Sequence, residues 1–342
     1  MQSNRDIPWF KGLFTKADLR VCFAIAILFS SKAYAQSRFE YEHRQMGTQI
    51  RLVFYAENGI EADSIAKLSF ERIDDLNSKL SDYIQDSELN RLCLTYLEDV
   101  EVSTDLHRIL KIANRISTRT NGAFDVSAGP LVRLWRDARK SKSVPKNSDI
   151  KYAKQNVGYT KIEFSSPTTI RLAKKDMQLD LGGIGKGYAA DEVLKLMEQH
   201  GISAALIDMG GDIRVSGPPG NKAFWNLAFS YYDKDGEEQI KHIQLKHGAV
   251  ATSGDLYQFV EIDGKRYSHI IDPNSGWALS DHSQVTVIAD TATRADAFAS
   301  AFSVLGIKQA KELVPQLQQL ELFMVQTLKG TKVQWQSPEF GQ

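Results

Sequence analysis

The alternation of hydrophobic and polar residues predicts both strands and helices along most of the chain. Residues 49–55, QIRLVFY, alternate polar and apolar side chains, as a strand with one buried face does. Residues 60–80 carry apolar side chains at near-helical spacing instead. Helices are also predicted from a cap at Ser103 or Thr104 to a stop at Asn121-Gly122, over 186–200, and over 294–305.

Short apolar runs predict the remaining strands. They are 161–164, 170–173, 177–181, 204–215 with an internal Gly-Gly turn, 224–229, 240–245, 258–262, 266–271, 284–288 and 320–325. The segment 141–149 is interpreted as an exposed linker. Because the strands come in runs and the helices follow no regular strand–helix rhythm, we expect an α+β fold with mixed or antiparallel sheets.

The N-terminus has the parts of a secretory signal. Three basic residues, Lys11, Lys16 and Arg20, precede a short apolar run at 21–29, and Ala33-Tyr34-Ala35 offers a small-residue cleavage site. We therefore expect a signal peptide over residues 1–35 and an exported mature chain over 36–342. The alternatives are an uncleaved anchor and a buried strand. Cleavage would leave Cys93 as the only cysteine, so the mature chain could form no internal disulfide.

Charge narrows the range of partners. The 342 residues include 42 basic and 42 acidic side chains, a formal net charge of zero. Such a balance gives no reason to expect a nucleic acid or an anionic membrane as the partner.

A glycine-rich segment over residues 179–191, LDLGGIGKGYAAD, is the first candidate for chemistry. Its glycine spacing does not match the dinucleotide fingerprint, and Lys186 is followed by Gly187 where a phosphate loop needs Ser or Thr. Glycines that let a backbone approach a ligand, a helix starting nearby and a lysine still favour an anion site. The alternative is a tight turn with a surface lysine. Asp191 is interpreted as an ordinary residue in the first turn of the following helix.

Two other segments could contribute to an active site. Asp296 and Ser300 are four residues apart in ATRADAFASAF, so they share one helix face and could hold a hard cation such as Mg²⁺. In YSHIIDPNSG, His269 is expected at the end of a strand, on the same face as Tyr267 and Ile271, where it could act as a general base. The alternatives are an alanine-rich helix with a solvated aspartate and a surface histidine.

Asp208 and Asp212 flank another Gly-Gly pair. They could be ligands, but a hairpin turn explains them equally well.

Eight segments in order resemble one family, the ApbE-type flavin transferases. They are Met46-Gly47-Thr48, LSDYIQDSEL, GAFDVSAGPL, LDLGGIGKGYAADEV, LIDMGGDI, AVATSGDLYQF, RYSHIIDPNSG and ADAFASAF. The resemblance covers nearly the whole mature chain and implies an ApbE-like (T-fold-like) α+β architecture. It also implies Mg²⁺-dependent cleavage of the FAD pyrophosphate, with FMN transferred to a threonine hydroxyl of an acceptor redox protein and AMP released.

The resemblance implies roles for twelve residues. Those that match FAD contacts are Met46, Tyr83, Ala123, Phe124, Asp125, Asp180, Lys186 and Ile270. Those that match the metal site are Gly183, through its carbonyl, Asp296 and Ser300, while His269 matches the proposed catalytic base. With the signal segment, this implies a periplasmic enzyme, either free or tethered to the outer face of the inner membrane.

Several positions depart from the usual family pattern. Ser300 stands where threonine is usual, so the hydroxyl ligand is kept while the methyl that restricts its rotamer is lost. Gly185 replaces a common alanine and is expected to loosen the turn. None of these changes removes an essential group. Two other functions remain open from the residues, an FAD pyrophosphatase that uses water and an FAD-binding protein without turnover.

Overall fold

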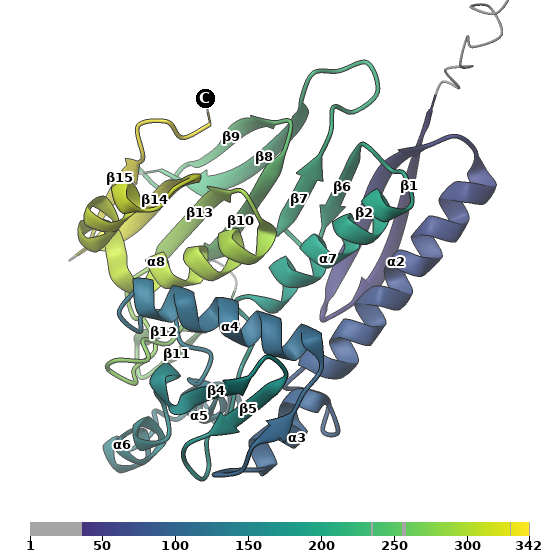
Figure 1. Cartoon of the computed structure of the whole chain (residues 1–342). Helices are drawn as coiled ribbons and strands as arrows, with labels where there is room; N and C mark the ends of the chain where they lie inside the picture. Colours follow the sequence, from purple (N-terminus) through teal and green to yellow (C-terminus); the bar gives the residue numbers. More distant parts are fainter. Residues whose placement is uncertain (1–35, 234, 255–257, 329, 342) are drawn as a thin grey trace, which may run out of the picture. The chain divides into compact units, whose positions relative to one another are not determined.

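Eight antiparallel strands form the central sheet of the chain (Figure 1). The computed structural model describes residues 36–233, 235–254, 258–328 and 330–341, so the expected signal segment 1–35 lies outside the described residues. In sheet order the strands are β1 (Ser37–Gln45), β2 (Thr48–Ala56), β6 (Ala205–Asp208), β7 (Ile213–Ser216), β10 (Gly248–Gly254), β13 (Ser283–Ala289), β14 (Leu320–Leu328) and β15 (Thr331–Gln336).

The sheet is buried on both faces because successive side chains of a strand point to opposite sides. In β2, Leu52 and Phe54 belong to one hydrophobic cluster while Val53 belongs to another. The same alternation holds in β14, where Leu322 belongs to the first cluster and Phe323 to the second. The first cluster lies under helices and the second under a β-hairpin.

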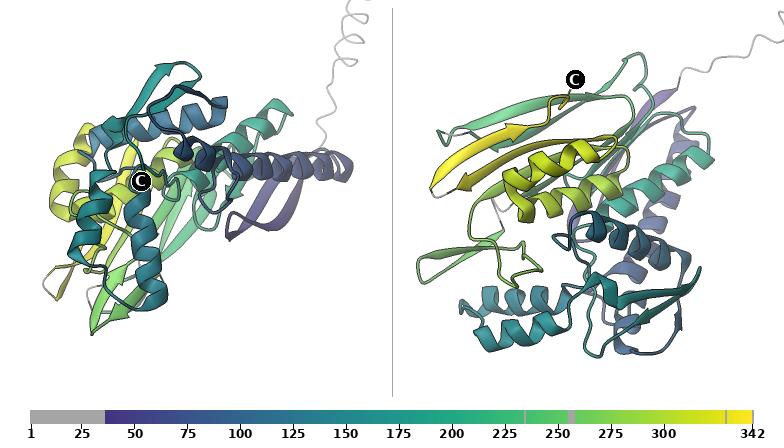
Figure 2. Two further views of the ribbon diagram at one scale, coloured as in Figure 1. Left: turned by 90° about the horizontal axis from the view of Figure 1, so that it is seen from below. Right: turned by 60° about the vertical axis from the view of Figure 1, so that its left-hand side comes forward.

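Three long helices cover the first face of the sheet (Figures 1 and 2). They are α2 (Gly59–Leu80), α7 (Gly185–Gln199) and α8 (Ala292–Leu313), and α4 (Thr104–Arg119) packs against α2 and α8. Gly306 interrupts α8 with a φ of 71°, at the residue where the predicted helix ends, and a short helical segment follows it. The hairpin of β8 (Trp225–Tyr232) and β9 (Glu238–Leu245) contributes Trp225 and Ile243 to the cluster on the other face.

Smaller elements surround this core. The strands β3 (Val100–Glu101), β5 (Thr169–Leu172) and β4 (Ile162–Ser166) form a three-stranded sheet, and β11 (Phe259–Ile262) pairs with β12 (Lys265–Ser268). The helices α5 (Gly129–Ser141) and α6 (Asn147–Gln155) pack on β11 and β12 in a third hydrophobic cluster that includes Trp135 and Tyr267. The last elements are α3 (Glu88–Leu94) and two short turns of 3₁₀ helix, η1 (Tyr159–Lys161) and η2 (Val314–Gln316). Among the described residues, no helix combines the length and apolar character needed to span a bilayer.

The α+β prediction with antiparallel sheets is confirmed, and most predicted strands and helices are present. The linker predicted over 141–149 is shorter than expected, because α5 ends at Ser141 and α6 begins at Asn147, so only residues 142–146 connect them. Residues 177–181 form no strand beyond an isolated bridge from Gln178 to Ala128. The strand predicted over 266–271 ends at Ser268, so His269 and Ile271 follow the strand rather than sharing its face.

Candidate active site

One cavity of about 420 Å³ brings together eleven of the twelve residues singled out from the sequence. Its walls come from the segment after α4, the start of α7, the turn between β6 and β7, the end of β10, the segment after β12, and α8. The eleven are Tyr83, Ala123, Phe124, Asp125, Asp180, Gly183, Lys186, His269, Ile270, Asp296 and Ser300. Their individual roles in binding and catalysis stay predictions.

Met46 is the exception, since it does not line the cavity. It occupies the tight turn between β1 and β2 with a φ of 49°, followed by Gly47 at 73°. The next residue, Thr48, packs on Gly210 so closely that a Cβ at Gly210 would lie 1.9 Å from the Thr48 hydroxyl oxygen. Because Gly210 lines the cavity, this turn lies beside its rim.

A lysine and two aspartates form the charged centre of the cavity. The Lys186 ammonium donates a hydrogen bond to the carboxylate of Asp212, which is almost fully buried. Burial disfavours the charged form of Lys186, but the carboxylates of Asp212 and Asp296 outweigh it and raise the pKa of Lys186. Burial, with a further contribution from Asp212, raises the pKa of Asp296 to about 7. One lysine therefore serves two buried acids, and the centre can accept more positive charge.

The donor set beside this centre fits Mg²⁺. A Cβ at Gly183 would lie 2.8 Å from the Ser300 hydroxyl oxygen, so the backbone of Gly183 and this hydroxyl are direct neighbours. Asp296 lies one turn before Ser300 on the same face of α8, and its Oδ2 accepts the N–H of Gly187 at 3.1 Å. Within the described part of the chain, no three His, Cys, Asp or Glu side chains cluster as a metal site. A carboxylate, a hydroxyl and a carbonyl leave coordination positions for water and substrate, as Mg²⁺ prefers.

His269 lines the same cavity and follows β12. Its Nδ1 is 3.1 Å from the carbonyl oxygen of Gln258, and its backbone N–H donates to the same oxygen at 2.9 Å. Because a carbonyl oxygen only accepts, a hydrogen bond here places a proton on Nδ1.

Two predicted ligand-contacting acids are held by the protein itself. The carboxylate of Asp125 accepts from the Ser127 N–H, the Ser127 hydroxyl and the Tyr159 N–H at 2.7–2.9 Å, so it shapes the segment 123–125. Asp180 accepts from the Gly182 N–H at 2.7 Å and from Arg136 at 2.8 Å. Both carboxylates therefore order the cavity wall, whatever else they contact.

Arg136 and Arg139 line the cavity although neither was singled out from the sequence. The Arg136 guanidinium also pairs with Asp82 and lies 4.3 Å from the centre of the exposed Tyr83 ring. Arg139 has a buried Nη1 atom without a hydrogen-bond partner among the described residues. Both project from α5, which the sequence pattern did not predict, so their three-residue spacing on one helix face went unused. Asp208 accepts the Gly211 N–H in the turn at 2.8 Å, as the hairpin interpretation expects, and Asp212 pairs with Lys186. A ligand role for either aspartate stays a prediction.

The interpretation of Asp191 as an ordinary first-turn residue is wrong. α7 begins at Gly185, so Asp191 lies in its second turn, where its carboxylate reaches the start of α8. It accepts the N–H groups of Ala292 and Thr293 at 3.0 and 2.9 Å and the Thr293 hydroxyl at 2.6 Å. Arg214 of β7 lies 3.0 Å away as its ion-pair partner. A neighbouring segment supplies this cap, which the local sequence cannot reveal.

Comparison with known proteins adds a family and a fold. A family model described as the ApbE family matches residues 46–324. The FAD:protein FMN transferase of Escherichia coli (strain K12) is 33% identical over 321 residues, 91% of this chain and 90% of that protein. Among solved structures, the flavin transferase ApbE from Vibrio cholerae has a TM-score of 0.81 and 27% identity, covering 89% of this chain and 98% of that one. The ApbE protein from Thermotoga maritima has a TM-score of 0.79 and 30% identity over the same shares.

Proposed function

Because the chain belongs to the ApbE family, we propose that it transfers FMN from FAD to a threonine hydroxyl of an acceptor redox protein, with Mg²⁺ in its active site. The chain is an FAD:protein FMN transferase, like the Escherichia coli relative that matches it over nine-tenths of its length. The observation that carries the finer proposal is that one cavity is lined by eleven of the twelve residues to which the resemblance assigns roles.

The proposed reaction breaks the phosphoanhydride bond of FAD and forms a phosphoester bond to the acceptor. The acceptor oxygen bonds to the phosphorus of the FMN half of FAD, and the bond from that phosphorus to the bridging oxygen breaks. AMP leaves with the bridging oxygen, and the hydroxyl proton passes to a base. Negative charge develops on phosphate oxygens, so the enzyme needs fixed positive charge and oriented donors more than covalent chemistry.

The charged centre of the cavity suits that need. Lys186 stays protonated because Asp212 and Asp296 raise its pKa, so it can face a phosphate as a full cation. Asp296, Ser300 and the carbonyl of Gly183 would hold the metal ion, which supplies Lewis-acid stabilisation of phosphate oxygens when bound. Ser300 keeps the hydroxyl ligand, and that hydroxyl lies next to the backbone of Gly183.

His269 is the proposed base. The Gln258 carbonyl accepts from Nδ1 and orients the ring, and we assign to Nε2 the role of accepting the proton of the acceptor hydroxyl. A hydroxyl is a poor nucleophile near neutral pH, and a positioned base contributes a factor of roughly 10²–10⁴.

The decisive experiment mixes the purified chain with FAD, Mg²⁺ and a redox protein that carries a threonine acceptor site. Covalent flavin fluorescence in the acceptor band of a denaturing gel, and its loss when that threonine is replaced by valine, is the expected result. Asp296→Ala should abolish transfer while the circular dichroism stays native. Full transfer by this variant would reject the metal site, and AMP release at the same rate without acceptor would identify a pyrophosphatase instead.

His269→Ala separates catalysis from binding. We expect transfer to fall by about 10²-fold or more, with FAD affinity changing less than threefold, because the base acts on the acceptor hydroxyl. An equal loss of both would make His269 a binding residue.

We also propose that the enzyme works in the periplasm after export by the segment 1–35, either free or held at the outer face of the inner membrane. The support is the basic, apolar and small-residue order of that segment. N-terminal sequencing of the exported protein should begin at Gln36. A cytoplasmic protein with an intact N-terminus would contradict this proposal.

A further inference from the structure

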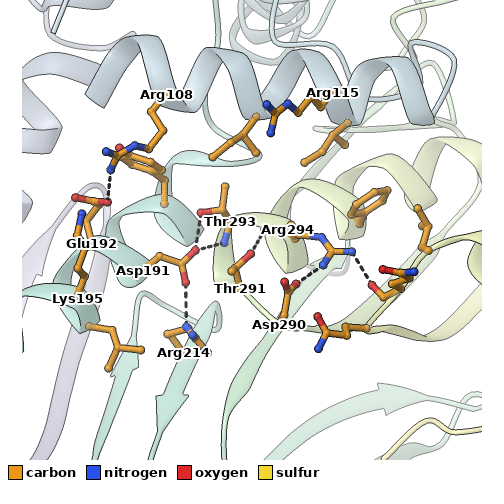
Figure 3. Close-up of a pocket in the computed structure, with 18 of the residues that line it drawn as sticks. Arg108, Arg115, Asp191, Glu192, Lys195, Arg214, Asp290, Thr291, Thr293 and Arg294 are labelled. Atoms are coloured by element: carbon orange, nitrogen blue, oxygen red, sulfur yellow. Dashed lines mark hydrogen bonds and ion pairs between the residues drawn. The ribbon is translucent and has the colours of Figure 1, made fainter. Parts of the chain in front are cut away.

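A second hollow, about 890 Å³ in volume, lies between α4, α7, the start of α8 and the residues after η2 (Figure 3). It is larger than the catalytic cavity, and it falls in the range of roughly 300–1,000 Å³ that small-molecule sites occupy. Arg108 and Arg115 enter it from α4, Lys195 from α7, and Arg214 from β7 (Figure 3).

The hollow carries more positive than negative charge, although the whole chain is neutral. Its lining includes six cationic and four acidic side chains. The acids Asp191, Glu192 and Asp290 are paired with Arg214, Arg108 and Arg294, respectively. The fourth acid, Glu198, accepts the hydroxyl of Ser216 at 3.2 Å.

Three of the cations have no such partner. Within the described residues, the side chains of Arg115, Arg119 and Lys195 make neither a hydrogen bond nor an ion pair. Arg115 and Arg119 are one turn apart on the exposed face of α4, and Lys195 comes from α7 across the hollow. These three cations come from two helices and line one hollow, in which Glu198 is the acid that has no cation partner among the described residues. The unpaired side chains therefore leave a net positive charge, which favours an anion.

Apolar surface lies next to these cations. Ile112 and Ile116 of α4, Phe298 of α8 and Leu317 after η2 line the same hollow. Ile112 and Leu317 are half-buried and supply most of this surface, since Ile116 and Phe298 are nearly fully buried. An inorganic ion would leave this surface uncovered, whereas a phosphate ester with an apolar or aromatic body would use both parts.

The hollow is separate from the catalytic cavity. In α8, Arg294 and Phe298 line the hollow, while Asp296 and Ser300 line the catalytic cavity. At 100° per residue these two pairs lie on opposite sides of the helix. In α7, Asp191 and Lys195 likewise face away from Lys186. The two helices form a wall between the sites, so one bound FAD cannot serve both.

We propose that this hollow is a second ligand site, which binds a phosphate ester with an aromatic body through Arg115, Arg119 and Lys195. The α8 N-terminus takes no part, because Asp191 already accepts its N–H groups. The site does not depend on the reaction assigned to the catalytic cavity.

AMP is the probe, since it combines one phosphate with one aromatic base. Calorimetric titration of the full chain in EDTA should show AMP binding. Arg115→Gln/Arg119→Gln should weaken that binding by at least about tenfold, and Lys195→Gln by about fivefold. Lys111→Gln is the matched control, because it removes one charge from the same face of α4 but outside this hollow, and it should bind AMP as the wild type does.

A second arm identifies which part of the ligand is recognised. If AMP binds at least about tenfold more tightly than inorganic phosphate, the apolar surface contributes as proposed. Equal affinities for the two probes would overturn the aromatic part of the proposal. Unchanged AMP binding in the arginine variant, or equal losses in Lys195→Gln and Lys111→Gln, would overturn the site, and an unaltered FAD affinity would show that the variants are folded.

Discussion

At the scale of single residues, two glycines near the start of α7 differ in whether their surroundings leave room for a side chain. A Cβ at Gly187 would lie 2.2 Å from the carbonyl oxygen of Ala292, so α7 and α8 touch through this residue. A Cβ at Gly185 would meet only the Cβ of Leu181 at 3.9 Å, an ordinary contact. Gly185 opens the helix with its N–H bonded to the Leu181 carbonyl at 2.7 Å, in a conformation that alanine also adopts.

Alanine substitutions at these two glycines should therefore change stability in opposite directions. We expect Gly185→Ala to raise the free energy of unfolding by about 0.4–1 kcal/mol, because it restricts the unfolded chain. Gly187→Ala should lower it by about 1–3 kcal/mol, because the two helices must separate. Urea unfolding of both variants measures the difference, and a Gly187→Ala protein as stable as the wild type would contradict the close packing.

The pKa of Asp296 predicts how Mg²⁺ binding depends on pH. Burial raises that pKa to about 7, so at lower pH the ion must displace a proton from the carboxyl group. The apparent Mg²⁺ affinity should rise by up to about tenfold per pH unit below pH 7 and level off above it. Calorimetry from about pH 5.5 to about pH 8.5, a range that brackets this pKa, should show the rise of Mg²⁺ affinity with pH in the wild type. Asp296→Asn should bind weakly at every pH, and a wild-type affinity that is flat across the range would reject this assignment.

At the scale of elements, the position of α8 depends on α7. Asp191 accepts three donors at the start of α8, while Thr291 accepts the Arg294 N–H at 3.3 Å as the local cap. Three residues after Thr293 comes Asp296, which contacts the N–H of Gly187. The same pair of helices thus carries both the cap and the proposed metal ligands, and disturbing the first should displace the second.

We expect Asp191→Ala to lower the free energy of unfolding by about 2–4 kcal/mol, because the helix loses its cap and Arg214 loses its partner. Asp290→Asn is the control at the same helix end. Its pair with Arg294 is more exposed, so its loss should cost less than about 1 kcal/mol. Thermal and urea unfolding compare the two, and equal losses would mean that the carboxylate of Asp191 does not hold α8 in place.

At the scale of the whole molecule, an ionic network joins three helices that are distant in sequence. Arg72 of α2 contacts Asp105 of α4 at 2.5 Å and Glu192 of α7 at 2.7 Å, and the Tyr188 hydroxyl of α7 donates to Asp105 at 3.1 Å. Burial alone would raise the pKa of Asp105, but the Arg72 guanidinium outweighs it and lowers that pKa to about 2. Because the folded pKa is depressed, the stabilisation is present above the ordinary value of 3.8 and is lost as the pH falls towards about 2.

Asp105→Asn should therefore destabilise the protein at pH 7, by about 1–3 kcal/mol. From about pH 4 to about pH 2, the wild type loses stability because Asp105 becomes protonated, and the variant should lose less. Urea unfolding at several pH values tests both statements. Glu71→Gln, in an exposed pair with Lys67, should follow the wild type throughout, and an Asp105→Asn curve parallel to the wild-type curve would remove this residue from the network.

The sequence by itself determined the fold class and most of the catalytic candidates. Alternation such as that of residues 49–55 reports which side of a strand is buried, and this information is local. The glycines, acids and histidine of the site lie in eight motifs that occur in the family's order. The resemblance therefore predicted that they come together in one site, even though Gly187 and Asp296 are 109 residues apart. The sequence pattern did not predict the helix α5, so Arg136 and Arg139 could not be assigned to one helix face.

Only the tertiary structure decided which side chains face one another. Asp212 became the partner of Lys186, and Asp191 became the cap of α8, through contacts between segments whose spacing in the sequence carries no signal. The second hollow arose in the same way, since its unpaired cations come from α4 and α7 and its apolar surface partly from α8. Side-chain periodicity reports burial within one element, whereas pairing across elements depends on how the helices pack on the sheet.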